Sequence, residues 1–237
     1  MKILITNDDS YTSESVAFLA QFFRSFGHDV TVIVPMKEQS GISMSTNVNR
    51  PFAYLKKDDH YYILDSSPVD CVRFGFYGLK RNFDLVVSGI NHGLNISDDI
   101  YYSGTCGAVY EAGRIGTNAL AISTNMASFN DSYQAFPSVW DYINKENLFA
   151  LNAMWNVNIP MRGTGKIVYA LFGDKHYDCA FDMTEDMLIQ RRNKHPELEP
   201  ACQSDVYQLE HNCNITISPL TLSRIDADLV QKLLSQK

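Results

Sequence analysis

The chain of 237 residues contains 45% hydrophobic, 20% charged and 12% aromatic residues, a balance that is typical of globular domains and excludes disorder over most of its length. Its 20 basic and 27 acidic residues give a formal net charge of −7 without any basic run, which disfavours a nucleic-acid duplex as partner. No stretch approaches the roughly 20 apolar residues of a membrane span, so we expect a cytoplasmic protein with no membrane partner.

The five cysteines are odd in number and widely spaced, without a CxxC motif or a Cys/His cluster; they are Cys71, Cys106, Cys179, Cys202 and Cys213. This pattern favours buried or incidental thiols in a reducing compartment over a disulfide scaffold. It also disfavours a structural zinc site.

The first 125 residues alternate β-branched runs with helical patterns, which predicts βαβ units and a parallel sheet. A helix is predicted from Val16 to Phe26, with Ser13 as the capping candidate and Gly27 as the left-handed residue that ends it. A second helix is predicted over 106–115. The predicted strands cover 2–6, 30–34, 84–87 and 119–123. We therefore expect an α/β fold, a Rossmann-like, doubly wound and mostly parallel sheet.

Beyond about residue 125 the pattern is looser, and 174–205 is left unassigned. We expect a helix over 139–155, strands over 156–160, 167–172 and 214–218, and a terminal helix over 225–234. The whole chain, 1–237, is predicted to be a single domain. Its catalytic core covers 1–125, and 126–237 contains the remainder of the core and a C-terminal extension used in oligomer contacts.

Two adjacent carboxylates, Asp8 and Asp9, directly follow the first predicted strand. Their mutual repulsion costs stability unless a cation or hydrogen-bond donors compensate it, and hard divalent cations do so through carboxylate oxygens. An Asx-rich turn that caps the next helix is the structural alternative. The position after strand one favours a site, because ligands of doubly wound sheets bind at the carboxyl ends of the strands.

Three further polar loops are expected at the same edge. Residues 37–41 offer the Ser40 hydroxyl, 88–95 offer two Asn and two Gly, and 103–105 precede a helix whose first turn attracts anions. Each loop alone has a structural alternative, respectively an ordinary loop, a turn and an N-cap. Together with the Asp pair they supply what metal-assisted attack on a phosphate ester requires.

Other phosphoryl-transfer designs do not fit these motifs. Phosphatases of the haloacid dehalogenase type place two Asp two residues apart, whereas Asp8 and Asp9 are adjacent. Receiver domains need an Asp at the end of a central strand, where this chain has Ser88. A Walker lysine loop and a GxGxxG motif are missing, so nucleoside triphosphate hydrolysis and dinucleotide binding lack their usual signatures.

The motifs NDDS, VPMKEQSGISMS, SPVDCV, FDLVVSGINHGLN, YSGTCGAVYEA and LAIS follow one another in the order and approximate spacing of the SurE family, which the chain resembles. The resemblance is close over roughly the first 125 residues and returns at NVNIP (156–160), at HYD (176–178), and at SDVYQL and ITISPLTL near the end. It implies a metal-dependent phosphatase of nucleoside monophosphates.

The resemblance also implies site residues. One divalent ion, Mg²⁺ or Mn²⁺, is expected at the positions that match the family's ligands, Asp8, Asp9, Ser40 and Asn91. Phosphate is expected at Asn95, Ser103, Gly104 and Thr105. Asp8 and Asp9 are the expected catalytic residues, which hold the ion and orient or deprotonate the attacking water. Family members hydrolyse nucleoside 5′- and 3′-monophosphates and form dimers or tetramers, so a homodimer or homotetramer is expected.

Two departures from the family pattern leave alternatives open. Ser10 replaces the glycine that usually follows NDD, which strains the turn by about 1 kcal/mol if a positive φ is needed there. Residues 174–205 are shorter than usual and lack the family's Gly- and Arg-rich pattern. A nucleotide-binding or scaffolding protein without turnover, or a structural oligomer without a ligand, are the competing interpretations. His92 is interpreted as a surface histidine rather than a general acid, and stays outside the assignment.

Overall fold

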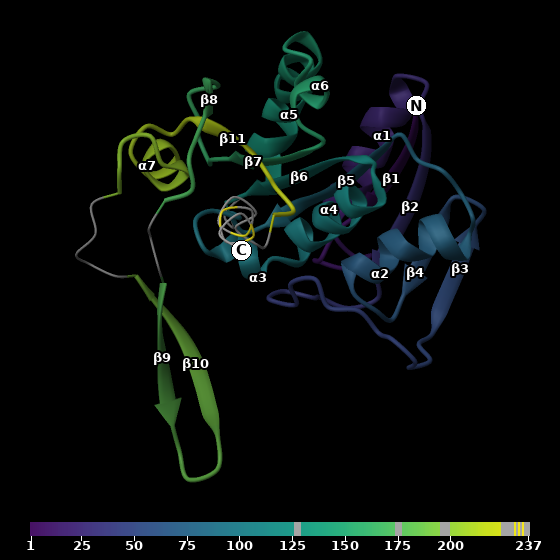
Figure 1. Ribbon diagram of the computed structural model, residues 1–237, viewed down its shortest axis with the longest axis horizontal. Coiled ribbons are helices and arrows are strands. Elements are labelled where there is room, and N and C mark those ends of the chain that lie inside the picture. The colour runs from purple at the N-terminus through teal and green to yellow at the C-terminus, as the bar shows by residue number, and fades with distance from the viewer. Residues whose placement is uncertain are drawn as a thin grey trace.

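The computed structural model describes residues 1–125, 129–173, 177–194, 200–223, 230, 232 and 234. In these ranges a nine-stranded sheet forms the centre of the molecule, in the order β3-β4-β2-β1-β5-β6-β7-β11-β8 (Figure 1). Neighbours are parallel except at β3–β4 and β11–β7. The strands are β1 (Lys2–Thr6), β2 (Asp29–Pro35), β3 (Tyr54–Asp58), β4 (Tyr61–Leu64), β5 (Leu85–His92), β6 (Asn118–Thr124), β7 (Met154–Ile159), β8 (Ile167–Tyr169) and β11 (Ile215–Pro219).

Helices cover both faces of this sheet, which confirms the predicted doubly wound α/β class. Helices α1 and α5 pack on one face around Phe23, Phe136 and Trp140, and α2 and α4 pack on the other around Leu4 and Val109. The helices are α1 (Glu14–Ser25), α2 (Pro68–Arg73) with the π-helical turn η1 (Phe74–Gly78), α3 (Asp99–Tyr102), α4 (Gly104–Ile115), α5 (Phe129–Lys145), α6 (Leu148–Leu151) and α7 (Asp205–Glu210).

The predicted elements of the first 125 residues are confirmed, with small shifts at their ends. Ser13 is the residue before α1, but its hydroxyl bonds the Ser15 hydroxyl at 2.9 Å and caps no backbone N–H. Gly27 follows the helix with φ 75°, as expected for a left-handed residue. Cys71 and Cys106 are free and fully buried, as predicted for core thiols.

The helix expected over 139–155 is wrong at both ends. Helix α5 begins at Phe129, includes Pro137 and ends at Lys145, and the left-handed residue Asn147, with φ 51°, then precedes α6. Met154 and Trp155 then belong to β7, where both are buried. The apolar run that continues past Asn147 forms the short helix α6, and pairing with β6 decides the conformation only from Met154 on.

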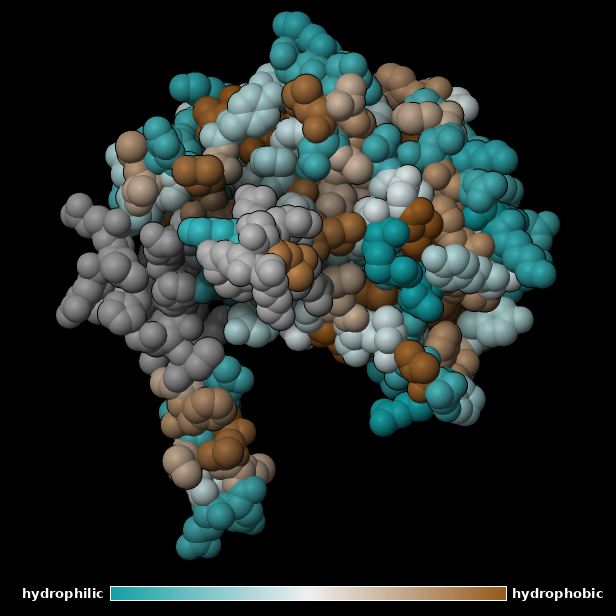
Figure 2. All heavy atoms as spheres, viewed as in Figure 1, coloured by the Kyte–Doolittle hydropathy of each residue, from teal (hydrophilic) through white to brown (hydrophobic). Residues whose placement is uncertain are grey.

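Residues that the sequence left unassigned form an antiparallel hairpin, β9 (Tyr177–Met183) and β10 (Leu188–Lys194), which projects from the body of the molecule (Figure 1). Apolar side chains are exposed along it, as Figure 2 shows, among them Phe181, Met183, Met187, Leu188 and Ile189. Most of the predicted terminal helix 225–234, His176 and His195 lie outside the described residues. Within the described part of the chain, no helix has the length and apolar character needed to cross a membrane.

Candidate active site

Asp8 lies at the carboxyl end of β1 with 3% of its surface exposed. Thr105, in the first turn of α4, donates its hydroxyl to Asp8 Oδ1 at 2.5 Å and its N–H to Asp8 Oδ2 at 3.2 Å. Burial raises the pKa of Asp8 to about 6, the Thr105 hydroxyl opposes this shift, and the charge of Asp9 adds to it. The first turn of α4 therefore fixes both oxygens of a carboxylate that is costly to ionise.

Asp9 is less buried and points to the loop after β5. Its Oδ2 accepts the N–H of His92 at 3.0 Å. Burial raises the pKa of Asp9, and the His92 N–H counteracts that effect. The His92 ring itself is exposed and lies 4.8 Å from the ring of Phe129. The backbone at the end of β5 thus orients Asp9, and the charge of the His92 ring also lowers the pKa of this carboxyl.

Residues 36–50, which we call the site loop, follow β2 and contain Ser40. The N–H of Gln39 donates to the carbonyl of Asp8 at 2.7 Å, which places the start of the loop beside the carboxylates. Ser40 is exposed, and its hydroxyl donates to Glu38 Oε1 at 2.9 Å. A hydroxyl that donates keeps its oxygen lone pairs, so Ser40 can still act as a ligand.

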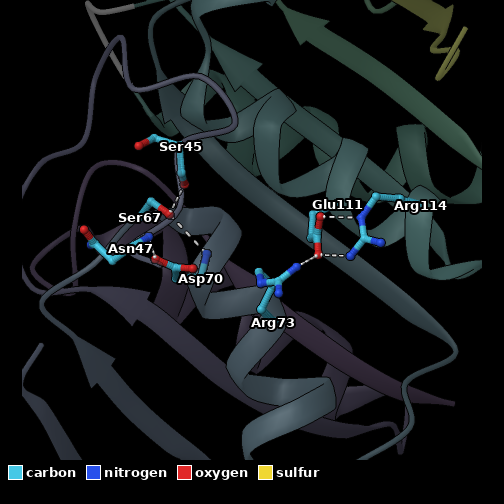
Figure 3. A network of polar contacts seen from close by, with 7 residues as sticks. All are labelled: Ser45, Asn47, Ser67, Asp70, Arg73, Glu111 and Arg114. Carbon is cyan, nitrogen blue, oxygen red and sulfur yellow. Dashed lines mark hydrogen bonds and ion pairs between the residues drawn. The ribbon is translucent and has the colours of Figure 1, made fainter. Parts of the chain in front are cut away.

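Helix α2 holds the far end of the site loop (Figure 3). Asp70 accepts the N–H of Asn47 at 2.8 Å, and Ser67 donates its hydroxyl to the carbonyl of Ser45 at 2.6 Å. Figure 3 also shows Arg73, at the other end of α2, paired with Glu111 of α4 at 2.9 Å. One short helix therefore connects the site loop to α4.

The N-terminus of α4 meets Asp8 closely. A Cβ added to Gly104 would lie 3.0 Å from the Asp8 Cβ and 3.1 Å from Oδ2, so a side chain there would crowd the carboxylate. Ser103 caps the helix by accepting the N–H of Cys106 at 3.0 Å. Since the Thr105 and Cys106 N–H groups are used in this way, these bonds leave the Gly104 N–H as the first-turn donor for an anion.

Asn91 lies near the end of β5, and Asn95 lies in the loop that follows this strand. The Asn91 Nδ2 donates to the carbonyl of Gly93 at 2.7 Å, which turns its Oδ1, the atom that a cation would use, to the other side of the amide. Asn95 is buried, and its Nδ2 donates to the hydroxyl of Ser123 at 2.7 Å. Asn158 of β7 accepts the Asn95 N–H at 2.8 Å and donates to its carbonyl at 3.0 Å.

The candidate ligands fit a hard divalent cation by their chemistry. Two carboxylates, a hydroxyl and a side-chain amide offer only oxygen atoms, which Mg²⁺ and Mn²⁺ prefer. Burial, with the charge of Asp9 adding to it, raises the pKa of Asp8, and a bound cation would offset both effects. In the described ranges no three or more His, Cys, Asp or Glu form a metal-holding group, so the predicted set depends on its two neutral members.

Comparisons with known proteins identify the family of this chain. The family model described as "Survival protein SurE" matches residues 3–178. This chain belongs to the SurE family. The SurE protein of Aquifex aeolicus, a crystal structure, has a TM-score of 0.79 and 26% identity, and the alignment covers 100% of this chain and 99% of that one.

Similar curated SurE proteins include two named "5'-nucleotidase SurE". That of Caldanaerobacter subterraneus subsp. tengcongensis is 29% identical over 248 residues, covering 99% of this chain and 97% of that protein. That of Neisseria gonorrhoeae is 37% identical over 165 residues, covering 68% of this chain and 65% of that protein. The SurE match includes every loop described above.

The sequence alone did not identify some of the residues that support the site. Ser67 and Asp70 form an S-x-x-D capping motif before an apolar run, a signal that could have identified α2 and its contacts. Asn156 and Asn158 alternate within an apolar strand, and such buried amides need partners, which Asn95 provides. The capping motif and the alternating Asn residues both predict structural hydrogen bonds. Neither pattern identifies the loop that forms these bonds.

Proposed function

We propose that this chain is a phosphomonoesterase that hydrolyses nucleoside 5′-monophosphates, and also 3′-monophosphates, with one divalent cation such as Mg²⁺ or Mn²⁺. The observation that supports this most directly is the contact between Asp8 and the first turn of α4. It joins a carboxylate pair to a helix N-terminus, where an anion is stabilised, in a chain whose relatives are named 5′-nucleotidases.

In this proposal one group of residues binds the cation and another binds the phosphate. Asp8, Asp9, Ser40 and Asn91 would hold the cation, which when bound supplies Lewis-acid polarisation of a phosphate oxygen. The Gly104 N–H, the α4 dipole and the Ser103 hydroxyl would bind the equatorial oxygens as negative charge develops on them. Asp9, the more exposed carboxylate, would orient the attacking water and accept its proton.

Phosphate release from a panel of nucleoside 5′- and 3′-monophosphates tests the proposal, measured after chelation and again with Mg²⁺ or Mn²⁺ restored. We expect release only with the metal. Asp9→Asn should abolish this release while circular dichroism shows a folded protein, and Asp141→Asn, an exposed carboxylate on α5, should have no effect. Metal-independent release, or full activity of Asp9→Asn, would contradict the assigned roles. Nucleotide-dependent thermal stabilisation without release would support the binding-protein alternative.

We also propose that the chain assembles into a homodimer or homotetramer through the β9–β10 hairpin. A two-stranded hairpin is marginally stable alone, and the exposed side chains of Phe181 and Leu188 favour burial against another copy. Light scattering after size exclusion should give a multiple of 26.8 kDa. Phe181→Ser with Leu188→Ser should reduce the mass, whereas Leu151→Ser, an exposed leucine of α6, should not. A monomeric wild-type chain would contradict this proposal.

A further inference from the structure

Residues 93–98, which we call the β5–α3 loop, connect the end of β5 to α3. Asn91 precedes this loop, Asn95 lies within it, and Ser103 and Gly104 directly follow the four-residue helix α3. The loop therefore lies between the position expected for the metal and the two positions expected for the phosphate. An element that fixes this loop also fixes the distances between these groups.

The sheet holds the β5–α3 loop at Asn95. The side chain of Asn156 donates to the Asn95 carbonyl at 2.8 Å, next to the bonds from Asn158 described above. Two residues later the backbone enters the left-handed region, since Ser97 has φ 50°. A residue with a side chain disfavours this conformation and keeps it only where the surrounding structure supports it.

Asp205 of α7 provides this support. Its Oδ2 accepts the N–H of Ser97 at 2.9 Å, and its Oδ1 accepts the N–H groups of Gly173 at 2.9 Å and Val206 at 2.8 Å. Asp205 is 1% exposed, and burial raises the pKa of its carboxyl while these N–H groups oppose the shift. An acidic residue in the first turn of a helix interacts with the helix dipole without burial, so α7 alone does not explain why this side chain is buried.

Further contacts hold α7 against the same loop. Ile96 forms a buried apolar cluster with Val206 and Leu209 of α7. The Ser97 hydroxyl donates to the carbonyl of Gly173 at 2.5 Å. The middle of the β5–α3 loop is thus held by a part of the chain that lies 108 positions later in sequence at Asp205.

We propose that Asp205 is a positioning residue of the candidate active site, because it fixes the β5–α3 loop and through it the phosphate-binding groups on both sides of the loop. The inference rests on the proposed function, in which phosphate binds at the N-terminus of α4. Asp205 acts through the backbone of Ser97 and contacts no reacting atom. Without the bond to Ser97 the left-handed turn can relax, and Asn95 then shifts relative to Ser103.

Asp205→Asn separates the bond to the loop from the other bonds of this carboxylate. Since Oδ1 accepts two N–H groups, the single amide oxygen should keep that side, and the new NH₂ group would then face the Ser97 N–H. Two donors that face each other cannot bond, so this variant should release the loop and stay folded.

Asn214→Ala is the matched control, because Asn214 is a buried polar residue that supports α7 from outside the loop. Its side chain bonds Gln208 of α7 and the Thr164 hydroxyl, each at 2.9 Å. Loss of these bonds should lower stability and leave the β5–α3 loop in place.

Hydrogen exchange read by mass spectrometry tests the positioning directly. The peptide 93–100 should exchange faster than wild type in Asp205→Asn and at the wild-type rate in Asn214→Ala. In wild type, inorganic phosphate should slow the exchange of this peptide, a measurement that needs no variant.

Steady-state kinetics and calorimetry test the consequence for the site. Asp205→Asn should raise the KM for AMP and the Kd for inorganic phosphate about tenfold each, with a smaller change in kcat, because displaced phosphate-binding groups weaken the bound ground state as well. Asn214→Ala should retain the wild-type KM and Kd, although a purely structural role of α7 would make the two variants alike.

The outcomes separate this proposal from the proposed function. Unchanged exchange of 93–100 in Asp205→Asn, equal changes in both variants, or faster exchange with wild-type KM and Kd would each overturn the role of Asp205. If wild type releases no phosphate from AMP, the proposed function fails, and hydrogen exchange with calorimetry on inorganic phosphate still decides this role. Wild type that binds no phosphate, or whose loop exchange phosphate does not slow, would overturn the proposal.

Discussion

Ser10 has the backbone conformation of the glycine that it replaces. Its φ is 82°, in the left-handed region that L side chains disfavour, and 6% of its surface is exposed. The Asn7 Nδ2 donates to the Ser10 carbonyl at 2.8 Å, and the Ser10 and Thr12 hydroxyls bond each other at 2.9 Å. The turn after Asp9 is therefore kept by local hydrogen bonds at a cost in backbone strain.

Ser10→Gly should stabilise the protein by about 0.5–1 kcal/mol, because relief of the left-handed strain exceeds the loss of the Thr12 hydroxyl contact. Chemical denaturation measures the change as a shift of the midpoint at constant slope. Ser13→Gly provides the comparison, since Ser13 has a negative φ and should lose stability. Destabilisation by Ser10→Gly would show that the hydroxyl contacts outweigh the strain.

For single residues, the sequence predicted which side chains lie at the carboxyl edge of the sheet. It was less successful in predicting the hydrogen-bond partners of each side chain. Asp8 and Asp9 follow β1 as expected, because a polar pair after a buried strand can only lie at the strand's end. The expected contact of Thr105 with phosphate stays a prediction, and the bonds from its hydroxyl and N–H to Asp8 were not predicted. Contacts between residues 97 positions apart depend on the packing of α4 against the sheet, which no local pattern contains.

Helix α2 is the element that most directly supports the site loop. Asp70 accepts hydrogen bonds from the Asn47 N–H and from the Ser66 hydroxyl, the latter at 2.5 Å, while it is 7% exposed. Loss of its carboxylate removes the acceptor of both donors and leaves the buried Ser66 hydroxyl without it. The end of the site loop would then keep only its bonds to Ser66 and Ser67, of which the Ser67 hydroxyl donates to the carbonyl of Ser45 at 2.6 Å.

Asp70→Ala should lower the free energy of unfolding by about 1–3 kcal/mol and raise the Mg²⁺ concentration needed for half-maximal activity. The second effect follows because Ser40 depends on the loop for its position. Glu111→Gln weakens the contact of α2 with α4 but leaves the loop contacts intact, so it should lose stability without changing the Mg²⁺ requirement. An equal rise of the Mg²⁺ requirement in Asp70→Ala and Glu111→Gln would show that α2 contributes to stability alone.

Most of the sheet strands were predicted, including β11 to within one residue, whereas β3, β4 and the hairpin were missed. The runs that became β1, β2, β5 and β6 are mostly apolar and almost entirely buried, as strands covered on both faces are. The exposed strand β3 has no such signal, since all five of its residues are exposed. The hairpin was missed for the same reason, because its apolar residues have no core of this chain to face.

The stability of the whole molecule should depend on the ionisation of Asp8. Its pKa is about 6 in the folded chain against an ordinary 3.8, so the folded state binds the proton more tightly than the unfolded state does. The stabilisation by protonated Asp8 is complete below about pH 3.8 and is lost as the pH rises through 6. A difference of about two pKa units corresponds to about 3 kcal/mol. The ionisation of Asp8 lowers the free energy of unfolding by this amount at pH 7.5.

Asp8→Asn should therefore be more stable than wild type at pH 7.5, by up to about 3 kcal/mol, and the difference should shrink as the pH falls from 6 to 4. The Thr105 hydroxyl can turn to accept from the new amide, so the local contacts remain satisfied. Denaturation curves at several pH values measure this. Adding Mg²⁺ should stabilise wild type and not the variant. A difference that does not vary with pH would exclude Asp8 as the titrating group.

The position of β11 governs the order in which the molecule can be completed as it is synthesised. β11 lies between β7 and β8 in the sheet, although both precede it in sequence by about fifty residues or more. Strands β1 to β7 can assemble as the nascent chain emerges, but β8 must wait for residues 215–219. The residues assigned to the metal and the phosphate all precede residue 106. A ribosome-bound chain therefore forms its candidate site before the far edge of its sheet closes.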